Sequence, residues 1–162
     1  MLRLLAISII FFVSAAILAC TNFIVTAGAS ADGSTMVSYS ADSHVLYGEL
    51  YYWAEADHAE GDLVDIREWD SNRPLMTIAQ IAHTWRVVGN INQHQVTIAE
   101  TTFGGKSEMH NPSVGIDYGS LIYIALQRSR TAREAISVMT SLAEEYGYCS
   151  EGESFSIADS QE

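Results

Sequence analysis

The chain has 162 residues and a formal net charge of −12, which repels nucleic acid phosphates; no basic cluster offsets it, so we expect no nucleic acid partner. Its two cysteines, Cys20 and Cys149, can form one disulfide at most, which excludes a scaffold built on disulfides. None of its five histidines has a histidine or cysteine partner at a zinc-like spacing, so we expect no metal site and no cofactor.

Residues 1–19 (MLRLLAISIIFFVSAAILA) have the pattern of a secretory signal peptide. Arg3 supplies a short positive region, and the apolar run that follows is shorter than the ~20 residues of a membrane span. Ala19 is a small residue of the kind that precedes a cleavage site. We therefore predict export to the periplasm or the exterior and a mature protein of residues 20–162. Its net charge would be −13, because only Arg3 is lost.

Two alternatives for this leader stay open. The apolar run could remain as an uncleaved anchor, or Cys20 could carry a bacterial lipid anchor, which would be the one reason to expect a membrane partner. An exported protein could also form a disulfide between Cys20 and Cys149, and that bond would disable a thiol nucleophile.

The first half of the mature chain is predicted to be mainly β-structure. A hairpin is expected from two β-rich runs around Asp32-Gly33, a strong turn signal. Further runs rich in β-branched and aromatic residues predict more strands. The predicted strands are Thr21–Ala27, Thr35–Ser40, Leu50–Ala54, Leu63–Trp69, Trp85–Gly89 and Val96–Glu100.

Two helices and a strand are predicted to follow. The first helix covers Tyr118–Gln127. The second begins at the capping box Thr131–Glu134 and stops at Gly147. Ser154–Ala158 reads as a last strand, and the chain ends soon after it. This order predicts an α+β fold with a helical layer on a mainly antiparallel sheet.

An N-terminal cysteine combines a thiol with a free α-amino group, and that pair can be a nucleophile and its own base. The amino group has a reference pKa of about 7.7–8.0, so part of it is neutral at physiological pH and can accept the thiol proton. The thiolate then attacks a carbonyl carbon. A further group must orient the amine, and a donor must stabilise the oxyanion.

Several motifs occur in a fixed order along the chain. They are Cys20–Phe23 (CTNF), Asp32–Thr35 (DGST), Ala41–Ser43 (ADS), Val88–Gln95 (VGNINQHQ) with Ala99–Thr102 (AETT), and Gly152–Asp159 (GESFSIAD). This ordered set resembles the cysteine dipeptidases, the group of dipeptidase A and the secernins, in the N-terminal-nucleophile hydrolase superfamily. The resemblance covers essentially all of residues 20–162.

The resemblance implies a fold, an activity and a set of site residues. The fold would be the αββα four-layer sandwich of the superfamily, and the reaction would be hydrolysis of dipeptides through an acyl-enzyme. Cys20 matches the nucleophile, Asp42 the aspartate that orients it and its amine, and Asn92 the turn asparagine of the oxyanion hole. Glu100 could bind a substrate amine, although a solvated strand end is the simpler interpretation.

Two departures from the family pattern leave other functions open. Tyr39 stands where relatives commonly have an arginine, three residues before Asp42. The family's enzymes are also longer, so we interpret residues 20–162 as the N-terminal part of a dipeptidase domain. A partial sandwich would leave one sheet face uncovered and favour self-association into homo-oligomers. The alternatives are a lipid-anchored protein without activity and an inactive dipeptidase fragment.

Overall fold

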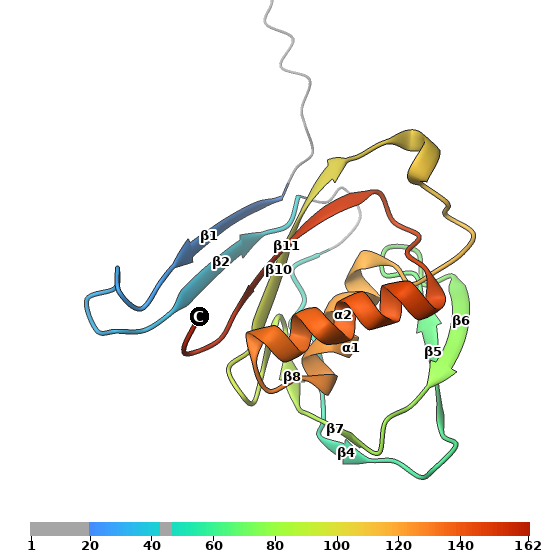
Figure 1. Ribbon diagram of the computed structural model, residues 1–162, viewed down its shortest axis with the longest axis horizontal. Coiled ribbons are helices and arrows are strands. Elements are labelled where there is room, and N and C mark those ends of the chain that lie inside the picture. Colours follow the sequence, from blue (N-terminus) through green and yellow to red (C-terminus); the bar gives the residue numbers. More distant parts are fainter. Residues whose placement is uncertain (1–19, 43–46) are drawn as a thin grey trace, which may run out of the picture.

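The computed structural model describes residues 20–42 and 47–162 and shows a mixed α/β fold with antiparallel sheets (Figure 1). Its helices are α1 (Tyr118–Arg128), α2 (Ala132–Tyr146) and the 3₁₀ turn η1 (Ser107–Met109). Its strands are β1 (Thr21–Val25), β2 (Met36–Ser40), β3 (Tyr52–Trp53), β4 (Ala56–Asp57), β5 (Leu63–Arg67), β6 (Pro74–Ala79), β7 (His83–Thr84), β8 (Val87–Val88), β9 (Ile91–Asn92), β10 (Thr97–Gly104) and β11 (Gly152–Ala158). The predicted signal peptide lies outside the described residues.

The predicted N-terminal hairpin is confirmed. Strands β1 and β2 pair antiparallel, with Asn22 opposite Tyr39. In the turn, the Asp32 carboxylate accepts hydrogen bonds from the backbone N–H and the hydroxyl of Ser34, and Gly33 has a φ of +78°. A positive φ is readily adopted by glycine, which explains why the turn forms at Asp32-Gly33.

The largest sheet has the strand order β11-β10-β9-β8-β3. Strands β10 and β11 form its longest pair and place Glu100 opposite Phe155. Strand β11 lies at one edge, so the predicted last strand is confirmed and has one neighbour in the described sheet. Strand β10 pairs with β9 only at Thr97. Much of that side of β10 is therefore left for contacts with other segments.

Both predicted helices are confirmed. At the start of α2, the Thr131 hydroxyl accepts a hydrogen bond from the Glu134 N–H. In a standard capping box the glutamate side chain accepts a hydrogen bond from the N-cap N–H, here Thr131. The Glu134 carboxylate instead accepts from the N–H of the preceding residue, Arg130. Gly147 ends the helix at a φ of +85°. The apolar faces of α1 and α2 form a core with residues of β5, β6 and β10, including Ile66, Ile78 and Ile98.

Strand β6 was not expected from the sequence. It pairs antiparallel with β5, with Val64 opposite Ile78. Pro74 opens the strand, a position where the missing N–H of proline is tolerated. Strands β4, β7 and β9 are two residues long each and carry too short a pattern to be predicted.

The hairpin β1–β2 lies against the β10–β11 pair, and the two helices lie together in front of the large sheet in Figure 1. The Asn22 side chain donates to the Glu100 carbonyl at 2.9 Å and lies within hydrogen-bond distance of the Thr101 and Ser156 hydroxyls. The α+β prediction is thus confirmed. The described residues form one helical layer, and among them no helix is long and apolar enough to span a membrane.

Candidate active site

The Cys20 thiol is held beside a buried carboxylate. Its Sγ lies 2.9 Å from Oε1 of Glu100 and donates a hydrogen bond to it across a separation of 80 residues. Cys20 directly precedes β1, and Asn22, two residues later, is bonded to the Glu100 carbonyl. Because residues i and i+2 of a strand share a face, the Asn22 anchor directs Cys20 to the same segment of β10.

Glu100 is 2% exposed, so the expectation of a solvated strand end is wrong. The Tyr39 hydroxyl donates to Glu100 Oε1 at 2.6 Å, and the Thr102 hydroxyl lies 3.4 Å from Oε2. A buried carboxylate is costly without hydrogen-bond donors. The Tyr39 hydroxyl and the Cys20 thiol supply them, while the single proton of the Thr102 hydroxyl has a closer acceptor in Glu153 Oε1.

Cys20 and Glu100 line a cavity of about 420 Å³. Its other carboxylates are Asp42, Glu68, Asp70, Asp117, Glu151 and Glu153. Among the described residues that line it there is no lysine or arginine. One carboxylate oxygen, Oδ1 of the 2% exposed Asp117, has no hydrogen-bond partner within the described part of the chain. A site of this kind favours a ligand with a positive charge.

The surroundings keep the Cys20 thiol protonated. Burial, followed by the hydrogen bond to Glu100, raises the pKa of Cys20 to about 11. The backbone N–H of Asp42 acts in the opposite direction and lowers the thiol pKa. At neutral pH the thiol therefore needs a base before it can act as a nucleophile.

Glu153 shares this acidic environment with Glu100. Burial, and then the neighbouring Glu100 carboxylate, raise the pKa of the Glu153 carboxyl to about 8. The Thr102 hydroxyl lies 2.9 Å from Glu153 Oε1, while Glu153 Oε2 has no partner among the described residues. Where two carboxyls lie close together, mutual repulsion keeps one of them protonated, and a bound cation can take the place of that proton.

Asp42 and Tyr39 both lie at this cavity. Asp42 is brought to Cys20, where its backbone N–H faces the thiol; its role in orienting an amine stays a prediction. Tyr39, at the place of the family's arginine, donates to Glu100 and contributes no charge. The Cys20 pKa accordingly lacks the lowering effect that a nearby guanidinium would have.

Asn92 requires a correction. Its side chain is 5% exposed, and Nδ2 donates to the carbonyls of Leu126 and Ser129, at 2.7 Å each. Its Oδ1 accepts from the backbone N–H groups of His94 and Val96. Both amide hydrogens are thus engaged, and Asn92 is absent from the lining of the Cys20 cavity. The side chain ties a turn to the end of α1 and has no N–H free for an oxyanion.

The residues that sequence reasoning missed are Glu100, as a contact of the thiol, and Glu153. One signal was available for Glu100, because Ile98 and Glu100 are two apart in a strand and share a face. The hairpin contacts that complete its burial come from distant residues and left no local pattern.

Cys149 also lines the cavity, and both cysteines are free thiols. The alternative of a disulfide between Cys20 and Cys149 is thus not realised in the structure. Within residues 20–42 and 47–162, no group of three or more His, Cys, Asp or Glu residues has a geometry that could hold a metal ion. The groups of the described lining that can exchange a proton are the thiols of Cys20 and Cys149, the carboxylates, the His110 imidazole and the hydroxyls.

The sequence model of one protein family, peptidase family C69, matches residues 19–55 and 63–162. The match includes Cys20, Tyr39, Asp42, Glu100 and Glu153, which are the residues that meet at the cavity.

Proposed function

The chain belongs to peptidase family C69, a family of cysteine-type peptidases, and we propose that it is an exported dipeptidase that acts through Cys20 as its N-terminal nucleophile. The observation that carries this proposal is the Cys20 thiol at 2.9 Å from the buried Glu100, on the wall of an acidic cavity. That arrangement offers a nucleophile and, beside it, carboxylates that can receive a small cationic substrate.

The first step of the proposed reaction is activation of the thiol. Removal of residues 1–19 gives Cys20 a free α-amino group with a reference pKa of about 7.7–8.0. The neutral amine accepts the thiol proton, and Asp42 orients the amine. The Asp42 N–H stabilises the thiolate, since it already lowers the thiol pKa.

The thiolate then attacks the carbonyl carbon of the dipeptide and forms a carbon–sulfur bond. The carbon–nitrogen bond breaks, and the ammonium at Cys20 returns its proton to the leaving amino acid. Water attacks the thioester, which releases the N-terminal amino acid and restores the thiol. Each cycle consumes one water molecule and needs no other reactant.

The substrate would be recognised through its α-ammonium group. Glu100 and Glu153 form a pair beside the nucleophile, and the described lining of the cavity holds no lysine or arginine to compete for them. An ammonium group is satisfied by carboxylates in such a site. This favours a substrate with a free amino terminus over the interior of a protein chain.

The proposed fold is the αββα sandwich of the N-terminal-nucleophile hydrolases. The hairpin bonded to β10 and β11, and the two helices that share a core with β10, support this arrangement of layers.

The proposal is tested by dipeptide hydrolysis. Protein that begins at Cys20 should hydrolyse dipeptides, while protein that retains residues 1–19, or carries Cys20→Ala, should not. The matched control is Cys149→Ala, which removes the other cavity thiol and should keep activity. Full activity of Cys20→Ala would contradict the proposed nucleophile.

A further inference from the structure

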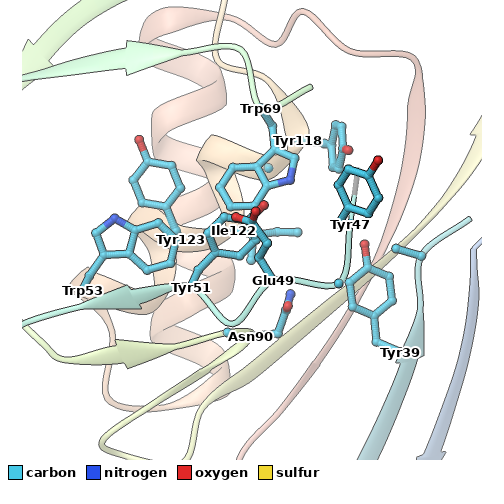
Figure 2. Close-up of a pocket in the computed structure, with 14 residues that line it drawn as sticks. Tyr39, Tyr47, Glu49, Tyr51, Trp53, Trp69, Asn90, Tyr118, Ile122 and Tyr123 are labelled. Atoms are coloured by element: carbon cyan, nitrogen blue, oxygen red, sulfur yellow. The ribbon is translucent and has the colours of Figure 1, made fainter. Parts of the chain in front are cut away.

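A second cavity, of about 280 Å³, is shown in Figure 2, and its lining overlaps that of the Cys20 cavity. The two cavities share Tyr39, Ala41, Trp69 and Tyr118 in their walls. The volume lies just below the range of about 300–1,000 Å³ that is usual for small-molecule sites. It therefore suits one amino-acid side chain better than a complete larger ligand.

The walls of this second cavity, which we call the aromatic pocket, are rings in contact with one another. Trp53 stacks on Tyr123 with ring centroids 5.0 Å apart and planes within 9°. The ring centroids of Tyr51 and Trp69 lie 4.7 Å apart. Figure 2 shows these rings grouped on one side of the pocket and Tyr39, Tyr47 and Tyr118 on the other. Rings in such arrangements attract further apolar and aromatic groups.

The aromatic pocket is held in shape by the backbone around Trp69. The Trp69 N–H donates to the Asp117 carboxylate at 2.8 Å. Its indole lies directly on α1 at Gly119, where an added Cβ would come within 2.3 Å of Trp69 Cγ. The absence of a side chain at Gly119 is therefore required for this wall of the pocket.

Tyr39 connects the aromatic pocket to the nucleophile. Its ring lines the pocket, and its hydroxyl donates to the Glu100 oxygen that the Cys20 thiol contacts. A substrate whose N-terminal Cα lies beside the Tyr39 hydroxyl can direct its carbonyl to Cys20 and its ammonium group to Glu100. Its side chain then extends across the Tyr39 ring into the aromatic pocket. All three groups belong to the N-terminal residue of a dipeptide.

We propose that the aromatic pocket binds the side chain of the substrate's N-terminal residue and selects dipeptides with a large apolar or aromatic residue there. The inference rests on the proposed function for the reaction, and on the shared walls of the two cavities for the location. Glu49, an exposed residue of the lining, is the one carboxylate among the described residues of the pocket, so the occupant is selected mainly by apolar contact.

Hydrolysis of two matched series tests the selectivity. In the first series the N-terminal residue varies before glycine, as in Phe-Gly and Ala-Gly, and in the second the C-terminal residue varies after glycine. We expect kcat/KM for Phe-Gly to exceed that for Ala-Gly by about tenfold or more. Trp53→Leu should reduce this ratio by about tenfold and leave the ratio of Gly-Phe to Gly-Ala unchanged.

The matched control is Trp85→Leu, the same change at an indole that lines neither cavity and contacts His83 and His94 instead. It should leave both ratios unchanged. An equal loss by Trp53→Leu on every dipeptide, or a change confined to the C-terminal series, would overturn the assignment.

Binding without hydrolysis separates this inference from the proposed function. Calorimetry on the Cys20→Ala protein should show L-phenylalaninamide binding at least about tenfold more tightly than glycinamide, and added Trp53→Leu should remove the difference. If the unmodified protein hydrolyses no dipeptide, the proposed function fails. The titration still tests whether the aromatic pocket binds an aromatic side chain. Equal affinity for the two amides would overturn it.

Discussion

The Tyr39 hydroxyl donates a 2.6 Å hydrogen bond to Oε1 of Glu100, the same oxygen that receives the Cys20 thiol. Tyr39 and Cys20 belong to the N-terminal hairpin, while Glu100 belongs to the large sheet. One buried carboxylate thus links two sheets at the proposed nucleophile. In the proposed reaction it binds the substrate amine, and its hydrogen bond adds to the effect of burial in raising the pKa of the thiol.

Glu100→Gln should separate these two effects. The hydrogen bond and negative charge of Glu100 both raise the pKa of Cys20, so the variant should lower it. The rate of Cys20 alkylation by iodoacetamide, measured against pH in a Cys149→Ala background, should shift to lower pH. Hydrolysis of dipeptides should nevertheless fall about tenfold or more, because the ammonium group loses a charged partner.

The control for this change is Glu144→Gln, at an exposed position of α2 outside the cavity. It should alter neither the alkylation profile nor hydrolysis. An unchanged or upward-shifted alkylation profile in Glu100→Gln would show that Glu100 does not govern the thiol.

Acetylation of the substrate amine should abolish most activity. The acidic cavity is matched to a positive charge, and an N-acetyl group would leave its carboxylates without a partner. We expect kcat/KM for N-acetylated Phe-Gly to be at least about a hundredfold below that for Phe-Gly. Comparable rates for the two substrates would argue against ammonium recognition.

Asn92→Ala should destabilise the fold without a specific effect on chemistry. The variant leaves the carbonyls of Leu126 and Ser129 and the N–H groups of His94 and Val96 without their buried partner. We expect the free energy of unfolding in urea to drop by about 3 kcal/mol. At the exposed Asn111, the same substitution should cost less than about 1 kcal/mol.

The kcat of the folded Asn92→Ala protein should remain within about threefold of the parent value. A large loss of kcat in a protein of unchanged stability would instead restore the oxyanion role that the hydrogen bonds of Asn92 argue against.

Glu153 should make stability fall as pH rises. Its pKa is about 8 in the folded chain, against an ordinary value of 4.5. Between these values the folded state binds more protons than the unfolded state, so the free energy of unfolding decreases with pH. The stability that the protonated Glu153 contributes is fully present below pH 4.5 and is lost as the pH rises through about 8. Glu153→Gln should flatten this slope in urea titrations, and Glu144→Gln should retain it.

Local signals account for the elements that the sequence predicted well. Asp32-Gly33 defines the hairpin turn, and Thr131 with Gly147 bounds α2. Strand β6 was missed because it opens with Pro74, a residue that argues against an interior strand.

The site was harder to predict because its contacts are non-local. Cys20 was singled out by its position after an apolar run, and the resemblance pointed to Asp42, which lies at the same cavity as Cys20. The same resemblance located the turn at Asn92 but could not give the direction of its side chain. Glu100 is contacted by Tyr39 and Cys20, which lie 61 and 80 positions earlier in the chain. Contacts over such separations leave no pattern in the sequence around Glu100.

The central claim is that Cys20 forms the acyl-enzyme. Acid quenching during dipeptide turnover preserves a thioester, and mass spectrometry of the digested protein then locates it. We predict that the peptide beginning at Cys20 carries the aminoacyl group of the substrate's N-terminal residue, with Cys149 unmodified. An aminoacyl group on another residue, or a mature N-terminus at Cys20 blocked by lipid in a protein that still hydrolyses dipeptides, would contradict the account.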